Sequence, residues 1–331
     1  MPLDNTLARV TLGRTGLQTS WLGVGTAPLG GLFAEVSEAQ AEAVVERAWE
    51  RGIRLFDTAP LYGFGLAERR LGRVLARRPR DEFVLTTKVG RLLRTEGVRD
   101  PSNDLDGEPI FKGVPDLRPV FDFSADGIQA SLAESRQRLG IDRIDVAYVH
   151  DPDAHYQQAR DLALPELRRL RAAGVLRGIG AGMNQCEMLA DFVRESDVDM
   201  VLVAGRYSLL DRSAASDLLP LCLERGIAVV AGGVFNSGVL ADPHRGATYD
   251  YAPAPQAVLD RVGELRGICA DHRVPLRAAA IQFVRRHPAV SAVLVGARSP
   301  QEVDDALEMG HFPIPEGLWS DLEGDQQEGH Q

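Results

Sequence analysis

The stretch LFDTAPLYGFGLAERRLG, residues 55–72, begins as an apolar strand-like run, passes through a turn and continues as a helix-like run. The turn carries an acid, Asp57, and an aromatic hydroxyl, Tyr62, followed at once by Gly63 and Gly65. A strand that leads through a short turn into a helix is typical of a βα unit in a parallel sheet. The polar residues follow the end of the strand, where the functional sites of such proteins lie.

The same alternation continues along almost the whole chain. Apolar runs predict strands at 21–27, 53–59, 83–89, 144–150, 177–182, 199–205, 227–233 and 291–297. Between them, apolar residues at helical spacing predict helices over 37–51, 66–77, 125–139, 185–195, 213–225 and 255–271. Strands that are apolar on both faces and alternate with helices predict a parallel (β/α)8 TIM barrel.

The alternative fold is a doubly wound open sheet, which favours a G-x-G-x-x-G turn after its first strand. The segment GVGTAPLGG, residues 23–31, has the wrong spacing, and GFGLAERRLG, residues 63–72, places its third glycine seven residues after the second. The barrel is therefore the better prediction, and these glycines serve tight turns and helix starts.

A length of 331 residues with 44% apolar content fits a single barrel. We expect one domain over 1–331, with its core over about 10–310. The segment VTLGRTGLQTSWLG, residues 10–23, predicts a hairpin that closes the bottom of the barrel. Residues 90–124 predict a long loop after the third strand, and 322–331 have the composition of a disordered tail.

The net charge of -10, without a basic block, argues against nucleic acid or anionic lipid as a partner. No apolar run approaches the roughly 20 residues of a membrane helix. Cys186, Cys222 and Cys269 are far apart and odd in number, and the first residues lack the features of a secretory signal. We expect a cytoplasmic protein with no metal site.

Polar side chains follow three consecutive strands of the predicted barrel. Asp57 and Tyr62 follow the second strand, Lys88 ends the third and His150 ends the fourth. Each alone has a structural explanation, as a turn cap, a packed aromatic or a core histidine. Because the carboxyl ends of barrel strands meet at one mouth, their joint placement predicts an active site.

Lys88 is the most informative of these residues. Of the 37 basic residues only Lys88 and Lys112 are lysines, the others being arginines. An ammonium at the end of an apolar strand needs a partner, and Asp57 on the neighbouring strand has the opposite charge. A compact ammonium beside a phenol stabilises the phenolate, so we expect Lys88 to lower the pKa of Tyr62 from its usual value of about 10.

The segments FDTAPLYGFGLAERRLG (56–72), TTKVGR (86–91) and YVHDPD (148–153) resemble the signature segments of the aldo-keto reductase superfamily. The resemblance implies a barrel that binds an extended nicotinamide dinucleotide without a Rossmann fold. It also implies a catalytic tetrad, which falls on Asp57, Tyr62, Lys88 and His150. In this tetrad the tyrosine is the general acid/base, the lysine and aspartate tune its pKa, and the histidine orients the reacting oxygen.

The resemblance also implies where the cofactor binds. Asn184 falls where the family binds the carboxamide, Tyr207 where the ring stacks, and residues 232–240 on the pyrophosphate loop. Many relatives have Ser and Gln where this chain has Met183 and Ala204. The implied cofactor contacts are Gly25, Thr26, Asp57, Asn184, Tyr207, Gly233, Val234, Phe235, Asn236, Gly238, Gly296, Arg298 and Glu302.

Gly296 and Glu302 stand where NADP-preferring relatives commonly have Lys and Arg. A carboxylate at this place repels a 2'-phosphate, which leaves Arg298 as the cation of the segment. We therefore expect NAD to be used at least as well as NADP.

The segments around these motifs are most similar to the sugar-oxidising branch of the superfamily. This resemblance implies oxidation of the anomeric carbon of a free aldose, such as L-fucose, D-arabinose or L-galactose, to an aldonolactone. The expected substrate contacts are Tyr62, His150 and Asp151, with Asn236 and Ser237 as further candidates, whereas Asp153 is as well explained by the turn at Pro152. Oxidation of pyridoxal, reduction of aldehydes or ketones, and a nucleotide-binding regulatory subunit remain alternatives.

Overall fold

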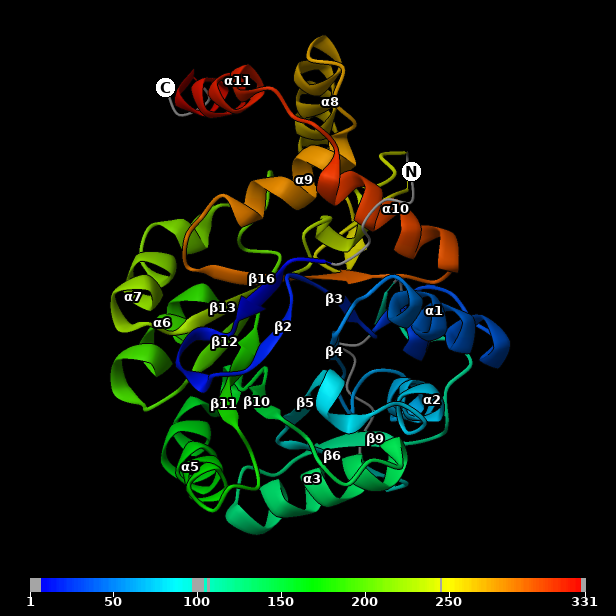
Figure 1. Cartoon of the computed structure of the whole chain (residues 1–331), viewed down its shortest axis with the longest axis vertical. Coiled ribbons are helices and arrows are strands. Elements are labelled where there is room, and N and C mark those ends of the chain that lie inside the picture. The colour runs from blue at the N-terminus through cyan, green and yellow to red at the C-terminus, as the bar shows by residue number, and fades with distance from the viewer. Residues whose placement is uncertain (1–6, 97–103, 106–107, 245, 329–331) are drawn as a thin grey trace.

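The computed structural model describes residues 7–96, 104–105, 108–244 and 246–328. Eight parallel strands close into a barrel, in the spatial order in which they follow one another along the chain (Figure 1). These strands are β3 (Leu22–Gly25), β4 (Leu55–Asp57), β5 (Val84–Val89), β10 (Val146–His150), β11 (Gly178–Met183), β12 (Met200–Ala204), β13 (Ala228–Gly232) and β16 (Val290–Gly296). The predicted (β/α)8 barrel and all eight of its predicted strands are confirmed.

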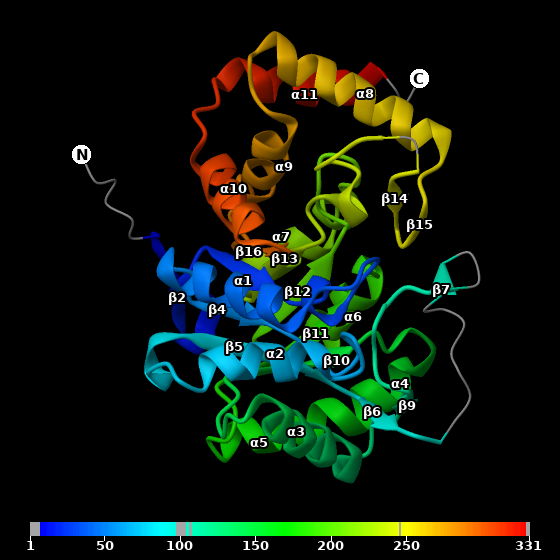
Figure 2. The ribbon, with the colours of Figure 1, turned by 90° about the vertical axis from the view of Figure 1, so that its right-hand side faces the viewer.

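Helices surround the barrel in a ring (Figure 1). The ring consists of α1 (Glu38–Glu50), α2 (Leu66–Leu75), α3 (Ala125–Leu139), α5 (Leu164–Ala172), α6 (Cys186–Glu195), α7 (Leu218–Arg225), α9 (Leu276–Arg285) and α10 (Pro300–His311). Two further helices, α8 (Gln256–Asp271) and α11 (Glu316–Glu328), lie outside this ring (Figure 2). A short α4 (Tyr156–Gln158) precedes α5. The six helices predicted from periodicity are all present, α7 being preceded by a short 3-10 turn over Ser213–Ala215.

The helix starts follow from capping residues. Ser37 accepts a hydrogen bond from the amide of Gln40, whose side chain bonds back to the amide of Ser37, so that α1 begins with a capping box. At the start of α3 the hydroxyl of Ser124 accepts a hydrogen bond from the amide of Gly127, and Gly140 ends that helix in the left-handed region at φ 64°.

The core has two layers. One lies between the ring of helices and the outer face of the strands, and the other fills the barrel itself. The inner layer is made of Leu12, Leu17, Leu55, Val84, Val146, Tyr148, Met200, Leu202, Ala228, Val230, Ala292 and Leu294. Because apolar side chains fill the barrel, it is a packed core and not a pore.

The predicted N-terminal hairpin is formed by β1 (Arg9–Thr11) and β2 (Gln18–Ser20). It lies against the amino ends of the barrel strands: a Cβ on Gly13 would be 2.7 Å from the amide nitrogen of Ala228, the first residue of β13. Arg14 pairs with Asp199, just before β12, at 3.2 Å. The hairpin therefore closes the bottom of the barrel, as predicted.

The predicted loop over 90–124 is in part a folded sheet, which corrects the sequence expectation. Strand β6 (Arg91–Arg94) pairs antiparallel with β9 (Arg118–Phe121), and β7 (Asp104–Leu105) pairs with β8 (Glu108–Pro109). Apolar side chains explain this order, since Ile110 and Phe111 form a small cluster with Leu61 at the carboxyl end of the barrel. A β-bridge between Leu32 and Phe111 joins the segment to the turn after β3.

The tail expected to be disordered over 322–331 is helical through Glu328, and 329–331 lie outside the described residues. Leu318, Trp319 and Leu322 are buried on one face of α11, which packs beside α8. The guanidinium of Arg286 lies 4.7 Å from the Trp319 ring. The apolar face of α11 and the Arg286 cation above it explain why this segment is ordered, although its polar composition predicted disorder.

No helix among the described residues combines the length and the apolar content that crossing a bilayer requires.

The close approach of α2 and α3 gives a test of the packing. A Cβ on Gly72 would lie 1.9 Å from the carbonyl oxygen of Leu139, so Gly72→Ala should lower the free energy of unfolding by about 3 kcal/mol. Gly263 in α8 is exposed with no atom near its Cβ position, so Gly263→Ala should raise that free energy by about 0.5–1 kcal/mol. Urea unfolding of both variants measures the difference, and equal stabilities would contradict the packing described.

Candidate functional site

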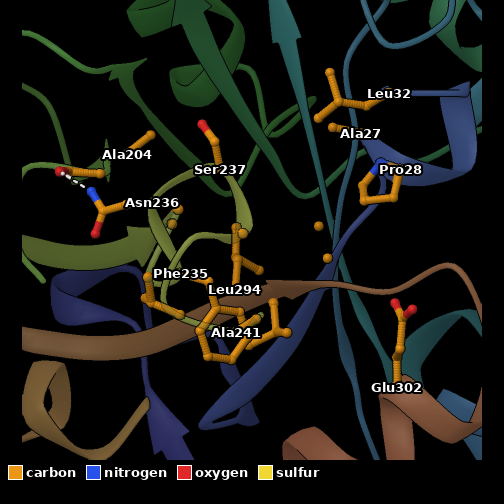
Figure 3. A pocket seen from close by; sticks show the side chains of 18 of the residues that line it. Ala27, Pro28, Leu32, Ala204, Phe235, Asn236, Ser237, Ala241, Leu294 and Glu302 are labelled. Carbon is orange, nitrogen blue, oxygen red and sulfur yellow. Dashed lines mark hydrogen bonds between the residues drawn. The ribbon is translucent and has the colours of Figure 1, made fainter. Parts of the chain in front are cut away.

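A cavity of about 640 Å³ opens at the carboxyl ends of the barrel strands. Its walls come from the ends of β3, β4, β12, β13 and β16 and from the turns that follow them (Figure 3). The lining includes most of the residues expected at the site: Gly25, Asp57, Tyr62, Asn184, Gly233, Val234, Phe235, Asn236, Gly238, Gly296, Arg298 and Glu302.

A buried ion pair lies at the bottom of this mouth. The Nζ atom of Lys88 lies 2.6 Å from Oδ2 of Asp57, and both residues are 2% exposed. Thr86 donates to Oδ1 of Asp57 at 2.6 Å, and Lys88 also donates to the carbonyl oxygen of Thr58 at 3.1 Å. The parallel pairing of β4 with β5 sets Asp57 opposite Thr86, so the pair predicted from the sequence follows from the strand register.

Tyr62 lies on the turn between β4 and α2, directly beside this pair. Lys88 Nζ is 4.6 Å from the centroid of its ring, and the ring meets that of His150 edge to face at 5.9 Å. Gly63, at φ 60°, makes this turn possible, because a Cβ there would lie 2.2 Å from the carbonyl oxygen of Gly30. The four residues of the expected tetrad are thus brought together.

Burial and charge act in opposite directions on the Tyr62 phenol. Burial raises its pKa above the usual value, while the charge and hydrogen bond of Lys88 act to lower it. The net direction is upward, so the sequence-based expectation of a lowered pKa is wrong, although Lys88 has the predicted effect. Burial alone would lower the pKa of Lys88, but the Asp57 carboxylate raises it overall, so the ammonium keeps its charge.

His150, at the end of β10, is a neutral imidazole at neutral pH. Burial, with the nearby charges of Arg91 and Lys88, holds its pKa well below the usual range. Its Nε2 lies 3.3 Å from Oδ2 of Asp151, and its Nδ1 has no hydrogen-bond partner within the described ranges. A neutral ring of this kind offers one donor and one acceptor to a bound molecule.

Asp151 and Asp153 have different surroundings. The Asp151 side chain is 26% exposed next to His150, whereas Asp153 is exposed in a 3-10 turn over Asp153–His155. Burial raises the pKa of Asp151, and the charge of Arg91 opposes that rise. Asp153 therefore fits the turn that was its structural explanation, whereas Asp151 is the carboxylate that contacts His150 and Arg91.

The opposite end of the cavity has the features of a nucleotide site. The Oδ1 atom of Asn236 is buried without a hydrogen-bond partner in the part of the chain described, while its Nδ2 donates to the carbonyl of Gly205 at 3.1 Å. Gly232 also lines this part of the cavity, and a Cβ there would meet Leu202, Ala204 and the carbonyl oxygen of Val203 only at ordinary contact distances of 3.5–3.9 Å. A large cavity with many apolar lining residues and a buried unpaired polar group fits a dinucleotide.

Two expected cofactor contacts lie elsewhere. Thr26 is fully buried behind the cavity wall, where its hydroxyl has no partner among the described residues. Tyr207 is 7% exposed, and its ring packs against Phe283 at 5.3 Å and His287 at 5.8 Å. Tyr207 is therefore part of the core beside α9 and not a stacking surface in the cavity, which corrects that prediction.

Several lining residues had no signal in the sequence. Phe33 and Tyr251 face each other across the rim with ring centroids 6.3 Å apart, and both have positive φ angles. Tyr251 lies at the tip of a hairpin of β14 (Thr248–Tyr249) and β15 (Ala252–Pro253), where its amide donates to Ser237 Oγ at 3.2 Å. Strands this short carry no periodicity by which to predict them.

Comparison with known proteins agrees with this geometry. The model of the aldo/keto reductase family matches residues 21–324. D-threo-aldose 1-dehydrogenase of a Pseudomonas species is 47% identical over 310 residues, which cover 93% of this chain and 94% of that protein. Pyridoxal 4-dehydrogenase of Microbacterium luteolum is 44% identical over 328 residues, which cover 94% and 95%.

Among solved structures, the holo form of an aldo-keto reductase from Bacillus halodurans is similar with a TM-score of 0.75. It is 24% identical and covers 96% of each chain, so this similarity shows the fold alone. The family match spans most of the chain, and the barrel carries the expected tetrad at its mouth. The chain belongs to the aldo/keto reductase family, and it is an oxidoreductase of the kind that uses a nicotinamide cofactor.

Proposed function

We propose that the protein oxidises the anomeric carbon of a free aldose to an aldonolactone, with NAD as the oxidant. The observation that carries this proposal is the buried Asp57–Lys88 pair beside the Tyr62 phenol, with His150 facing the same ring. The similarity to D-threo-aldose 1-dehydrogenase over nearly its whole length supports the sugar as substrate.

Each residue of the site has its own role in the proposed reaction. A bound nicotinamide dinucleotide supplies the acceptor for the hydride. Once its own proton has left, Tyr62 accepts the proton of the anomeric hydroxyl, and the ammonium of Lys88 favours the phenolate that this step requires. Asp57 keeps Lys88 charged and in place, and neutral His150 orients the reacting oxygen by a hydrogen bond.

The sugar is held next to Tyr62, which lines the cavity, with His150 against the Tyr62 ring and Asp151 beside His150. A carboxylate beside His150 accepts hydrogen bonds from hydroxyl groups next to the reacting carbon. The Asp151 side chain is 26% exposed, so its carboxylate is accessible to such a hydroxyl. Asn236 and Ser237 remain further candidates for polar contacts from the loop after β13.

Pyridoxal is the second candidate substrate. The relative that oxidises pyridoxal is 44% identical to this chain, and the Phe33–Tyr251 pair at the rim offers aromatic faces to a flat ring. The same tetrad serves either substrate, so the choice depends on the residues that surround the reacting carbon.

The cofactor preference is proposed from the start of α10. Glu302 accepts a hydrogen bond from the amide of Arg298 at 2.8 Å, and its carboxylate lies 3.8 Å from the Nε of that arginine. Arg298 is therefore already paired, and Glu302 presents negative charge to the cavity. Both features disfavour a 2'-phosphate, which supports NAD over NADP.

Replacing the phenol tests the proton-transfer role. Tyr62→Phe should reduce kcat by about 10²–10⁴-fold, because only the group that moves the proton is lost. The dissociation constant for NAD, measured by quenching of tryptophan fluorescence, should stay close to that of the unaltered protein. Tyr156→Phe is the matched control, since its hydroxyl bonds only to Glu195 away from the cavity. Turnover near the original rate in Tyr62→Phe would remove this residue from the mechanism.

Replacing one carboxylate tests the cofactor preference. Glu302→Gln should tighten NADP binding by about fivefold and leave NAD binding nearly unchanged, because one repulsive charge near the 2'-phosphate is removed. Glu308→Gln on the exposed side of the same helix serves as the control. Calorimetric titration of both cofactors measures the effect. The preference is refuted if the unaltered protein binds NADP far more tightly than NAD.

A substrate panel tests the sugar. L-fucose, D-arabinose and L-galactose share their configuration around the ring, so all three should be oxidised with a higher kcat/KM than D-glucose. Asp151→Asn should raise the KM for these sugars, since an amide replaces the charged acceptor. The assay follows reduction of NAD by absorbance at neutral pH. If pyridoxal supports the reduction of NAD and none of the aldoses does, pyridoxal oxidation replaces aldose oxidation as the proposed function.

A further inference from the structure

Arg91 is a buried charge in the insertion, residues 90–124 between β5 and α3, and it lies close to His150. It begins β6, three residues after Lys88 in the sequence, and is 8% exposed. Its Nη2 donates to Oδ2 of Asp151 at 3.0 Å. On the other side, its guanidinium lies 4.9 Å from the ring of Phe121, its partner across the β6–β9 pair. The insertion therefore holds Arg91 from one side and Asp151 holds it from the other.

Asp151 is held in an uncommon backbone conformation. Its φ of 37° is rare for a residue with a side chain, and its amide donates to the carbonyl of Gly182 at 3.2 Å. The contacts with Arg91 and with His150 both fall on Oδ2. The other oxygen, Oδ1, has no hydrogen-bond partner among the residues that the structure describes, and the side chain is 26% exposed. One carboxylate oxygen thus remains for a bound molecule.

The hydrogen-bond donors of the Arg91 guanidinium are only partly satisfied. Its Nε is buried with no partner in the described part of the chain, which costs about 1–3 kcal/mol for a donor of this kind. Several other described arginines share this feature, namely Arg51, Arg78, Arg136, Arg143 and Arg212, so what distinguishes Arg91 is the group that it contacts. The contact it does make is with the acid beside His150.

We propose that Arg91 is a positioning residue that holds the Asp151 carboxylate as the acceptor for a substrate hydroxyl next to the reacting carbon. This inference rests on the proposed function, because it assumes a substrate that carries such a hydroxyl. Arg91 acts through Asp151 and does not itself touch the reacting atoms.

The charges around Asp151 support this role. Burial and the neighbouring Asp153 both favour the protonated acid, whereas Arg91 and Lys88 favour the carboxylate. Without Arg91, the pKa of Asp151 would rise further, which weakens the preference for the carboxylate that accepts the hydroxyl. Arg91 therefore preserves both the charge and the orientation that the hydrogen bond requires.

The test compares KM and kcat in three variants at saturating NAD. Arg91→Gln should raise the KM for L-fucose about tenfold to a hundredfold, the range of a charged hydrogen bond, with kcat changed much less. Arg91→Lys should recover part of the loss because it restores the charge. Arg94→Gln is the matched control: this arginine ends the same strand but bonds to Glu134 on α3 at 2.9 Å, so KM should not change.

The 2-deoxy sugar separates a positioning role from a structural one. In the unaltered protein, 2-deoxy-L-fucose should have a much higher KM than L-fucose, and in Arg91→Gln this difference should largely disappear. An unchanged KM in Arg91→Gln, or an equal loss for both sugars, would overturn the inference. If pyridoxal is oxidised and aldoses are not, the proposed substrate is wrong, and the same comparison with pyridoxal and 3-deoxypyridoxal decides the role of Arg91.

Discussion

The buried ion pair between Asp57 and Lys88 is the constraint on which the site depends. Two charges with 2% exposure are costly to remove from water, and their mutual attraction offsets that cost only when every remaining donor and acceptor is satisfied. Here Thr86 donates to Asp57, and Lys88 has the carbonyl of Thr58 and the hydroxyl of Tyr62 as further partners. Such a pair is a poor source of stability, so its position beside the Tyr62 ring is better explained by its effect on that phenol.

The two ends of the barrel differ in structure: the amino ends are closed by apolar packing, and the carboxyl ends carry the polar groups of the site. At the amino ends of the strands, the hairpin of β1 and β2 adds Leu12 and Leu17 to the inner core and excludes water. At the carboxyl ends, short turns carry the polar groups, and the insertion after β5 brings Arg91 to the acid next to His150. Burial at this end lowers the pKa of His150, and the neutral imidazole that this favours fits the proposed role of orienting an oxygen.

Much of this arrangement could be predicted from the sequence, because it depends on local patterns. Apolar runs and helical spacing located the eight strands and six of the helices, and the rule that strand ends converge brought Asp57, Lys88 and His150 together. The exceptions depend on contacts between distant segments. The β6–β9 sheet, the order of α11 and the packing of Tyr207 against α9 each require a partner that no local pattern names. The net direction of the Tyr62 pKa depends on burial, which the sequence does not specify.

The most direct test of the central claim is a titration of the Tyr62 phenol itself, followed by the ¹³C resonance of its Cζ in protein labelled at tyrosine. Tyr62→Phe assigns the signal, and the titration is repeated in Lys88→Met after circular dichroism has established that this variant is folded. The pKa of Tyr62 should lie above its usual value in the unaltered protein and rise further in Lys88→Met, since the cation that favours the phenolate is gone. A Tyr62 pKa that is unchanged or lower in Lys88→Met would contradict the claim that the buried pair controls the proton.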